Sequence, residues 1–196
     1  MKRLAVTIAA VALVLLVGTG TTAALWNDSE AVEGTTVNSG TLKLTMNGQS
    51  QVTIGPLSGL YPGGVIATKI ALAGQASGNL GLDYTLAAIL SDTSSASSTL
   101  YGIIDAQVFT QSDAGASCAS TGLPDGMQVY GSGGGFTELS ALVVTESLVA
   151  PAADSATTHL CIRFTIPAGT PPDVGGIELS GAATTFTITA TGEGTR

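Results

Sequence analysis

The stretch Thr158-His159-Leu160-Cys161-Ile162-Arg163-Phe164-Thr165-Ile166 alternates between apolar and polar residues over nine positions. A period of two places alternate side chains on opposite faces of an extended chain, which is typical of a strand with one buried face. The inward row is predicted to be Leu160, Ile162, Phe164 and Ile166, and the outward row His159, Cys161, Arg163 and Thr165.

The same period recurs along the chain. It is found in 41–46, 80–86 and 184–191, and the last of these carries a threonine ladder at Thr185, Thr187, Thr189 and Thr191 opposite Phe186 and Ile188. Further strands are expected at 51–54, 65–72, 101–109 and 127–130, with loops at 91–98 and 131–135. The best helix candidate after residue 40 is 136–146, although its β-branched residues weaken that prediction.

Many short strands separated by turn residues predict an all-β fold with antiparallel strands. One sheet alone cannot hide its apolar face, so a two-sheet β-sandwich is expected. We find no linker and no repeat in the sequence, and residues 25–196 are therefore interpreted as a single domain.

The first 24 residues have the three parts of a secretion signal. Lys2 and Arg3 precede the apolar run 4–17, and small residues follow in Thr22-Ala23-Ala24-Leu25. This pattern predicts a signal helix that is cleaved after Ala24, with Ala23 as the alternative. A retained membrane anchor is the other interpretation, but the apolar run is shorter than the ~20 residues that a span needs.

Charge and cysteine content agree with export. Removing Lys2 and Arg3 with the signal takes the net charge from −8 to −10, which disfavours nucleic acid and anionic lipid as partners. Contact with the membrane is expected only through the signal before cleavage. The two cysteines, Cys118 and Cys161, are predicted to form a disulfide that holds the loop 113–124 across the outside of a sheet. Such a bridge is worth ~4 kcal/mol in the chain-entropy model.

Catalytic motifs are missing from the sequence. His159 is the only histidine, so sites that need two histidines are excluded, and no Gly-x-Ser-x-Gly motif is present. On an outward strand face, His159 is interpreted as a solvated residue and not as a catalytic base. Two acidic pairs, Asp173 with Glu178 and Glu30 with Glu33, are interpreted as solvated turn residues and not as calcium ligands. We therefore predict no catalytic residue, no metal and no cofactor.

The residues around the cleavage point carry a resemblance. Ala24-Leu25-Trp26-Asn27-Asp28 followed by Asn38-Ser39-Gly40-Thr41-Leu42-Lys43-Leu44 resembles the opening of the TasA/camelysin family of secreted bacterial proteins. Looser similarities lie at 60–64, 164–167 and 181–186, and the middle region 91–157 shows none. The resemblance implies a jelly-roll-like sandwich in the biofilm matrix or at the cell surface, and cleavage by a dedicated, ER-type signal peptidase.

The resemblance also implies self-association into fibres, in which the segment after the cleavage point adds as a strand to a neighbouring copy. In this sequence residues 25–40 are polar, with four apolar anchors at Leu25, Trp26, Val32 and Val37. An unpaired sheet edge would accept such an exchangeable segment. The alternative is that the segment pairs with its own sheet as a first strand.

Two other functions remain open at this point. Camelysin-like relatives have been classed as metallopeptidases, which makes a secreted peptidase the first alternative. The second is a surface adhesin or binding module that uses the threonine-rich faces or the middle loops.

Overall fold

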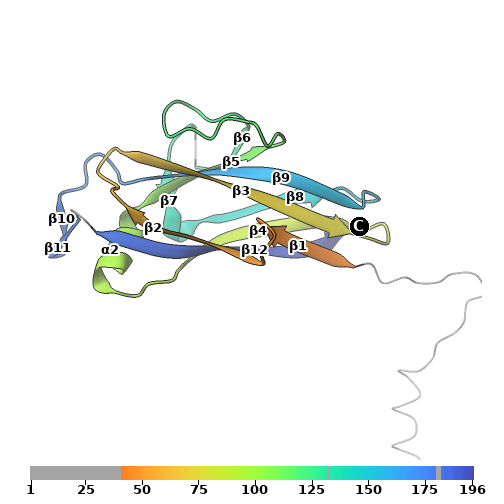
Figure 1. Cartoon of the computed structure of the whole chain (residues 1–196), viewed down its shortest axis with the longest axis horizontal. Coiled ribbons are helices and arrows are strands. Elements are labelled where there is room, and N and C mark those ends of the chain that lie inside the picture. Colours follow the sequence, from red (N-terminus) through yellow and green to blue (C-terminus); the bar gives the residue numbers. More distant parts are fainter. Residues whose placement is uncertain (1–40, 132, 180–181) are drawn as a thin grey trace, which may run out of the picture. The chain divides into compact units, whose positions relative to one another are not determined.

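The computed structural model describes residues 41–131, 133–179 and 182–196. Two antiparallel sheets pack face to face (Figure 1), which confirms the predicted all-β sandwich. The first sheet has the order β1-β3-β9-β5-β6, with β7 beside β5. Its strands are β1 (Leu42–Met46), β3 (Val65–Ala76), β5 (Asp105–Gln111), β6 (Met127–Tyr130), β7 (Thr137–Glu138) and β9 (Ser155–Thr165).

The second sheet has the order β2-β12-β4-β8. Its strands are β2 (Gln51–Ser58), β4 (Gly81–Leu90), β8 (Val143–Val149) and β12 (Ala183–Thr195). The chain changes sheet between β1 and β2, β2 and β3, β3 and β4, β4 and β5, β7 and β8, β8 and β9, and β9 and β12. It therefore alternates between a six-stranded and a four-stranded sheet, as in a jelly-roll-like sandwich. A separate hairpin joins β10 (Asp173–Val174) to β11 (Ile177–Glu178).

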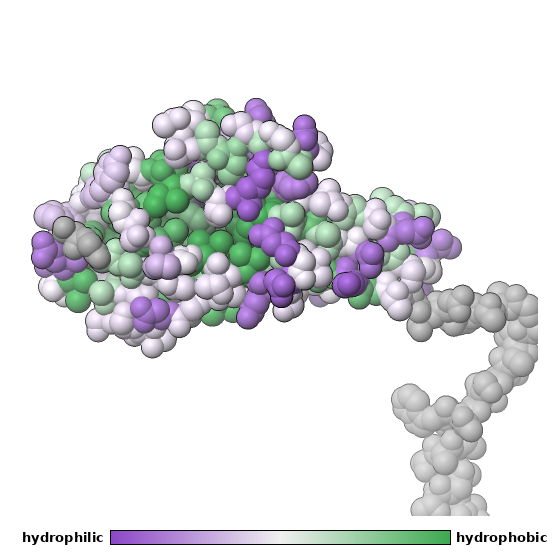
Figure 2. Space-filling view, viewed as in Figure 1, coloured by the Kyte–Doolittle hydropathy of each residue, from purple (hydrophilic) through white to green (hydrophobic). Residues whose placement is uncertain are grey.

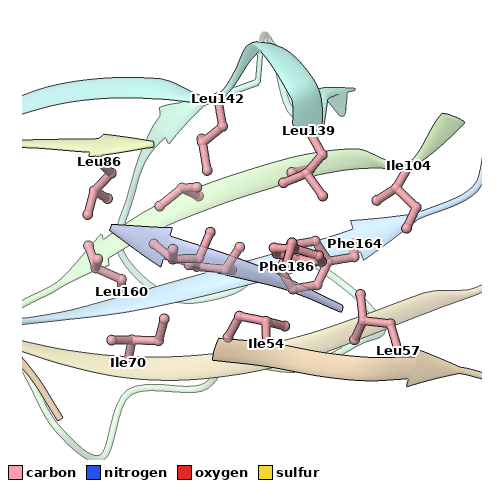
Figure 3. Close-up of a cluster of buried hydrophobic side chains, with 14 of the residues drawn as sticks. Ile54, Leu57, Ile70, Leu86, Ile104, Leu139, Leu142, Leu160, Phe164 and Phe186 are labelled. Carbon is pink, nitrogen blue, oxygen red and sulfur yellow. The ribbon is translucent and has the colours of Figure 1, made fainter. Parts of the chain in front are cut away.

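Apolar side chains from both sheets fill the space between them (Figure 3). Phe164 of β9 and Phe186 of β12 meet edge to face at the centre, with ring centroids 5.2 Å apart. The inward row predicted for 158–166 is fully buried, since Leu160, Ile162, Phe164 and Ile166 are each 0 % exposed. The period-two pattern therefore placed the core face of β9 correctly.

One helix was missed. The serine-rich residues 91–98 were expected to form a loop and 101–109 a strand, but α2 (Ser95–Ile103) occupies much of this region and β5 starts at Asp105. Ser94 caps the helix, because its side chain accepts a hydrogen bond from the Ser97 amide. Leu100 then packs into the core, and burial of this residue fixes the helix against β12.

The helix predicted for 136–146 is wrong. This segment contains β7, a short 3-10 helix η1 (Leu139–Ala141) and the start of β8. Val143, Val144 and Thr145 are β-branched, and pairing with β4 provides the extended backbone that such residues favour.

Candidate functional site

Cys118 and Cys161 form the predicted disulfide, with an S–S distance of 2.07 Å. Cys161 lies on β9, and its side chain is on the face of the first sheet that points away from the core. Cys118 belongs to the segment between β5 and β6, residues 112–126, which we call the bridge loop. The bridge loop therefore lies across the outside of the first sheet, as the sequence predicted.

Side chains of the sheet hold the bridge loop at several points. Arg163 donates from Nη2 to the carbonyl oxygen of Ser120 at 2.9 Å. Gln111 donates from Nε2 to the carbonyl oxygens of Ser117 and Asp125, both at 2.7 Å. Lys69 donates from Nζ to the carbonyl oxygen of Ala114 at 2.9 Å. The loop is thus fixed by one covalent bond and by hydrogen bonds from three strands.

This cover changes the environment of the outward row of β9. Cys161 is fully buried, and Arg163 and Thr165 are 5 % and 7 % exposed. His159 was expected to be solvated, but it is half-buried, and its Nδ1 has no hydrogen-bond partner among the described residues. The assignment of these residues to the outer face was right. The bridge loop is bonded to Cys161 and Arg163, whereas the Thr165 hydroxyl donates to the carbonyl oxygen of Gly64 at 2.8 Å.

Two other sequence candidates are turn structures. Asp173 and Glu178 lie opposite each other in the β10–β11 hairpin, and Asp173 Oδ1 accepts a hydrogen bond from the Gly176 amide at 3.0 Å. The glycine cluster at 131–135 is held by Gln128, whose Oε1 accepts from the Gly134 amide at 3.1 Å. Both arrangements satisfy the chain's own backbone.

One side of the sandwich is open and apolar. The strand β3 pairs with β9 from Val65 to Gln75, but β1 covers only Leu72–Ala76 on its other edge. The hydrogen bonds between Asn47 and Ala71 end this cover. Among the described residues, 65–70 therefore have no strand beside them on that edge. We call this edge, together with the facing strand β2, the β2–β3 side.

The β2–β3 side exposes part of the core. Val52 of β2 and Ile66 of β3 are half-buried and pack against the central cluster. Figure 2 shows hydrophobic side chains gathered in the region where Figure 1 places these two strands. Pro56 has no backbone N–H, so it removes one hydrogen-bond donor from the edge of β2. Residues 65–70 of β3 contain no proline. The free edge of β3 is consequently the better template for another strand.

The opposite side of the sandwich carries a cavity lined mostly by polar residues. This cavity of about 470 Å³ opens between β4 and β8 of one sheet and β5 and β9 of the other. Four of its lining residues are Tyr84, Thr110, Glu146 and Thr158. The nearby inward-facing residues on the same strands are apolar and belong to the core. We call this region the polar cavity.

Tyr84 and Glu146 are the chemically distinctive pair in the polar cavity. They are direct partners in the β4–β8 register, and Tyr84 is only 1 % exposed. Burial, with a contribution from the negative charge of Glu146, raises the pKa of Tyr84 to about 12. The phenol is therefore neutral under ordinary conditions, and its hydroxyl has no hydrogen-bond partner among the described residues.

Several predicted residues lie outside the described part of the chain. These are the cleavage residues Thr22, Ala23, Ala24 and Leu25 and the strand anchors Trp26, Val32 and Val37. Within the described part, no helix has the length and hydropathy to cross a membrane. The described residues also contain no cluster of three or more histidine, cysteine, aspartate or glutamate side chains arranged to hold a metal ion.

Comparison with known proteins gives no relative. No protein-family model matches the chain, and a search of the curated proteins finds no match. The TasA/camelysin resemblance at residues 24–44 thus stays a prediction.

Proposed function

We propose that this protein is an exported structural protein of the cell surface or extracellular matrix, which assembles with copies of itself by strand addition. The observation that carries the proposal is the incomplete cover of β3. Five of its residues pair with β1, and the edge from Val65 to Ile70 has no neighbouring strand among the described residues. An added strand would satisfy this edge and cover the half-buried apolar side chains of the β2–β3 side.

The candidate donor is the segment 25–40, which directly precedes β1 in the sequence. Its apolar anchors Leu25, Trp26, Val32 and Val37 supply side chains for the apolar β2–β3 side. Strand addition gives affinity through backbone hydrogen bonds and specificity through alternate side chains. Donor and acceptor are different parts of the chain, so successive additions do not close and produce filaments.

The disulfide supports the export part of the proposal. Structural disulfides form and persist in oxidising compartments and are rare in the reducing cytosol. Cys118 and Cys161 are bonded to each other, and the bond holds a loop that buries Arg163. A protein with this bridge is suited to the environment outside the cell, to which the predicted signal would send it.

The donor is tested with the mature chain, residues 25–196, and a variant in which Trp26, Val32 and Val37 are all replaced by serine. We expect fibres from the first in electron micrographs and light scattering, with assembly that rises with protein concentration. We expect the variant to remain monomeric. A second form that lacks residues 25–38 should behave like the variant, and equal fibre formation by all three would refute the role of the donor.

The acceptor is tested by charge. The donor segment contains Asp28, Glu30 and Glu33 and no basic residue. Thr68→Glu places a carboxylate beside the free edge of β3, at a half-buried position on the face that carries Ile70. A thermal melt must first show that this variant folds, and the folded variant should repel the donor and block assembly. Val143→Glu is the control for the other edge, because Val143 is 64 % exposed on the edge strand β8 at the other side of the second sheet. Inhibition by Val143→Glu alone would place the acceptor at β8 instead.

A further inference from the structure

The polar cavity has the size of a ligand site. Its volume of about 470 Å³ lies within the range of small-molecule pockets. The walls come from strands of both sheets, with Ser112 and Gly126 of the bridge loop at one side. It also lies on strands β4, β5, β8 and β9, away from the β2–β3 side to which we assign assembly.

The hydroxyl of Tyr84 is a buried polar group that lacks a hydrogen-bond partner among the described residues. Buried polar atoms are nearly always hydrogen-bonded, and the exceptions call for an explanation. Tyr84 is 1 % exposed, it lines the cavity, and its hydroxyl makes no hydrogen bond to any described residue. A ligand atom in the cavity would provide the partner that the chain does not.

The other polar groups in the lining indicate whether the ligand group should donate or accept hydrogen bonds. Thr110 and Thr158 donate their hydroxyl protons to the carbonyl oxygens of Met127 and Gln111, at 3.4 and 3.2 Å. Their oxygens are left with lone pairs that can accept. Glu146 is the one charged residue in the lining, and its carboxylate only accepts. Among the described residues the cavity wall is therefore rich in acceptors and has no basic side chain.

We propose that the polar cavity binds a primary ammonium group, carried either by a small free amine or by a lysine side chain of a partner. An ammonium has three donors and no acceptor, which matches the carboxylate of Glu146 and the oxygens of Tyr84 and the two threonines. The ring of Tyr84 adds an electron-rich face for a cation. An anion would be repelled by Glu146, and a neutral sugar would leave the Glu146 carboxylate without a cation.

The test is a titration of the mature chain by calorimetry and NMR, at concentrations where it is monomeric. The probes are 1,5-diaminopentane and Nα-acetyl-lysine N-methylamide, with 1-pentanol, glutarate and maltose as neutral, anionic and sugar comparisons. We expect binding of the two amines only, with chemical-shift changes at β4, β5, β8 and β9, and weaker binding at high salt. Tighter binding of the diamine assigns a free amine, and tighter binding of the blocked lysine assigns a protein side chain.

Three variants tie the binding to the cavity. Glu146→Gln should weaken amine binding by about tenfold or more, because the charged acceptor is lost. Tyr84→Phe, which removes only the hydroxyl, should weaken it by a smaller factor and keep the thermal stability of the parent. Asp83→Asn is the matched control, since Asp83 is the neighbouring residue on β4 and lines no part of the cavity.

Two outcomes would overturn the proposal. One is a failure of selective amine binding, seen either as no amine binding at millimolar probe concentrations or as equal binding of maltose or 1-pentanol. The other is an equal loss of binding in Asp83→Asn and Glu146→Gln, which would mean that only the overall charge of the protein matters. The proposal does not rest on strand addition, so either can fail without the other.

Discussion

The guanidinium carbon of Arg163 lies 5.4 Å from the centre of the Phe136 ring. The same guanidinium donates from Nη1 to Gln107 Oε1 at 3.0 Å and from Nη2 to the carbonyl oxygen of Ser120 at 2.9 Å. Burial lowers the pKa of Arg163, and its partners are neutral groups. The cation is therefore stabilised by carbonyl oxygens and a π face, and these contacts bring together β5, β9, the bridge loop and the segment before β7.

Replacing Arg163 tests this role directly. Arg163→Met keeps much of the side-chain volume but leaves the oxygens of Gln107 and Ser120 without their donor. We expect the free energy of unfolding to fall by about 2–4 kcal/mol, measured by urea denaturation. Arg163→Lys should recover only part of the loss because lysine lacks the planar fork. Arg196→Met, at an exposed terminal residue, should change it by less than about 0.5 kcal/mol; a similar effect of both methionine variants would contradict the role of Arg163.

The disulfide is expected to stabilise the fold by restricting the unfolded chain. The double variant Cys118→Ala with Cys161→Ala should lose about 2–4 kcal/mol, since the chain-entropy value of ~4 kcal/mol is an upper figure for real bridges. Amide exchange in the bridge loop should rise, whereas exchange in the core strand β12 should rise only by the change in global stability.

Arg163 and the disulfide hold the same loop, so their effects should not add. We expect the triple variant to be more stable than the sum of the separate losses implies, by about 0.5–3 kcal/mol. Strict additivity would mean that the two contacts fix the loop independently.

Gly126 should tolerate no larger residue. It has φ +107, and a Cβ at this position would lie 2.2 Å from the carbonyl oxygen of Thr110, a backbone atom that cannot move away. We expect Gly126→Ala to cost more than about 3 kcal/mol, or to prevent folding. Gly122→Ala is the matched control in the same loop, with φ +74 and nothing within 4 Å of the added carbon, and it should cost about 1–2 kcal/mol. Equal thermal shifts for the two variants would contradict this account.

The fold was readable from the sequence because the period-two pattern is present in β1, β4, β9 and β12, and all four strands contribute side chains to the core. The pattern gives the face on which a side chain lies, but it does not give what covers that face. Cys161 and Arg163 were assigned to the outer face correctly, and their burial depends on the bridge loop, which carries no period. The helix α2 escaped because its first turn consists of small and polar residues that resemble a loop, and its core contacts, at Leu100, Tyr101 and Ile103, all lie in its second half.

The two open sides could not be predicted, for the same physical reason. The polar cavity needs Tyr84 and Glu146 to be register partners, and this register includes an irregularity between Leu82 and Asp83. The free edge of β3 exists because β1 is seven residues shorter than β3, with five residues against twelve. Strand length and register are settled by tertiary pairing, which local sequence does not determine.

Asp105 and Glu138 should repel each other across the β5–β7 pair, where they are direct partners. Burial, and then the charge of Glu138, raise the pKa of Asp105, so the folded protein holds this proton more tightly than the unfolded chain. Stability is consequently lost as pH rises through the titration of Asp105. Glu138→Gln should raise the free energy of unfolding at pH 7 by a few tenths to about 1 kcal/mol, with a smaller gain at pH 3. A gain of the same size at both pH values would show that charge is not the cause.

Tyr84 should limit stability at high pH. Its pKa of about 12 in the folded protein compares with 10.0 for an ordinary tyrosine, through burial first and Glu146 second. The neutral phenol is favoured in the folded state, so stability falls between about pH 10 and pH 12 as the unfolded chain releases its proton. Two pKa units correspond to about 3 kcal/mol. Between pH 10 and pH 12, the free energy of unfolding of the parent should therefore fall by about 3 kcal/mol relative to that of Tyr84→Phe.

A spectrophotometric titration provides the direct measurement. The difference between the parent and Tyr84→Phe isolates one tyrosinate, and its midpoint is expected near 12. Glu146→Gln should lower that midpoint without returning it to 10, because burial is the larger cause. A midpoint at 10 in the parent would show that the hydroxyl meets bulk water, which would contradict its burial beside the polar cavity.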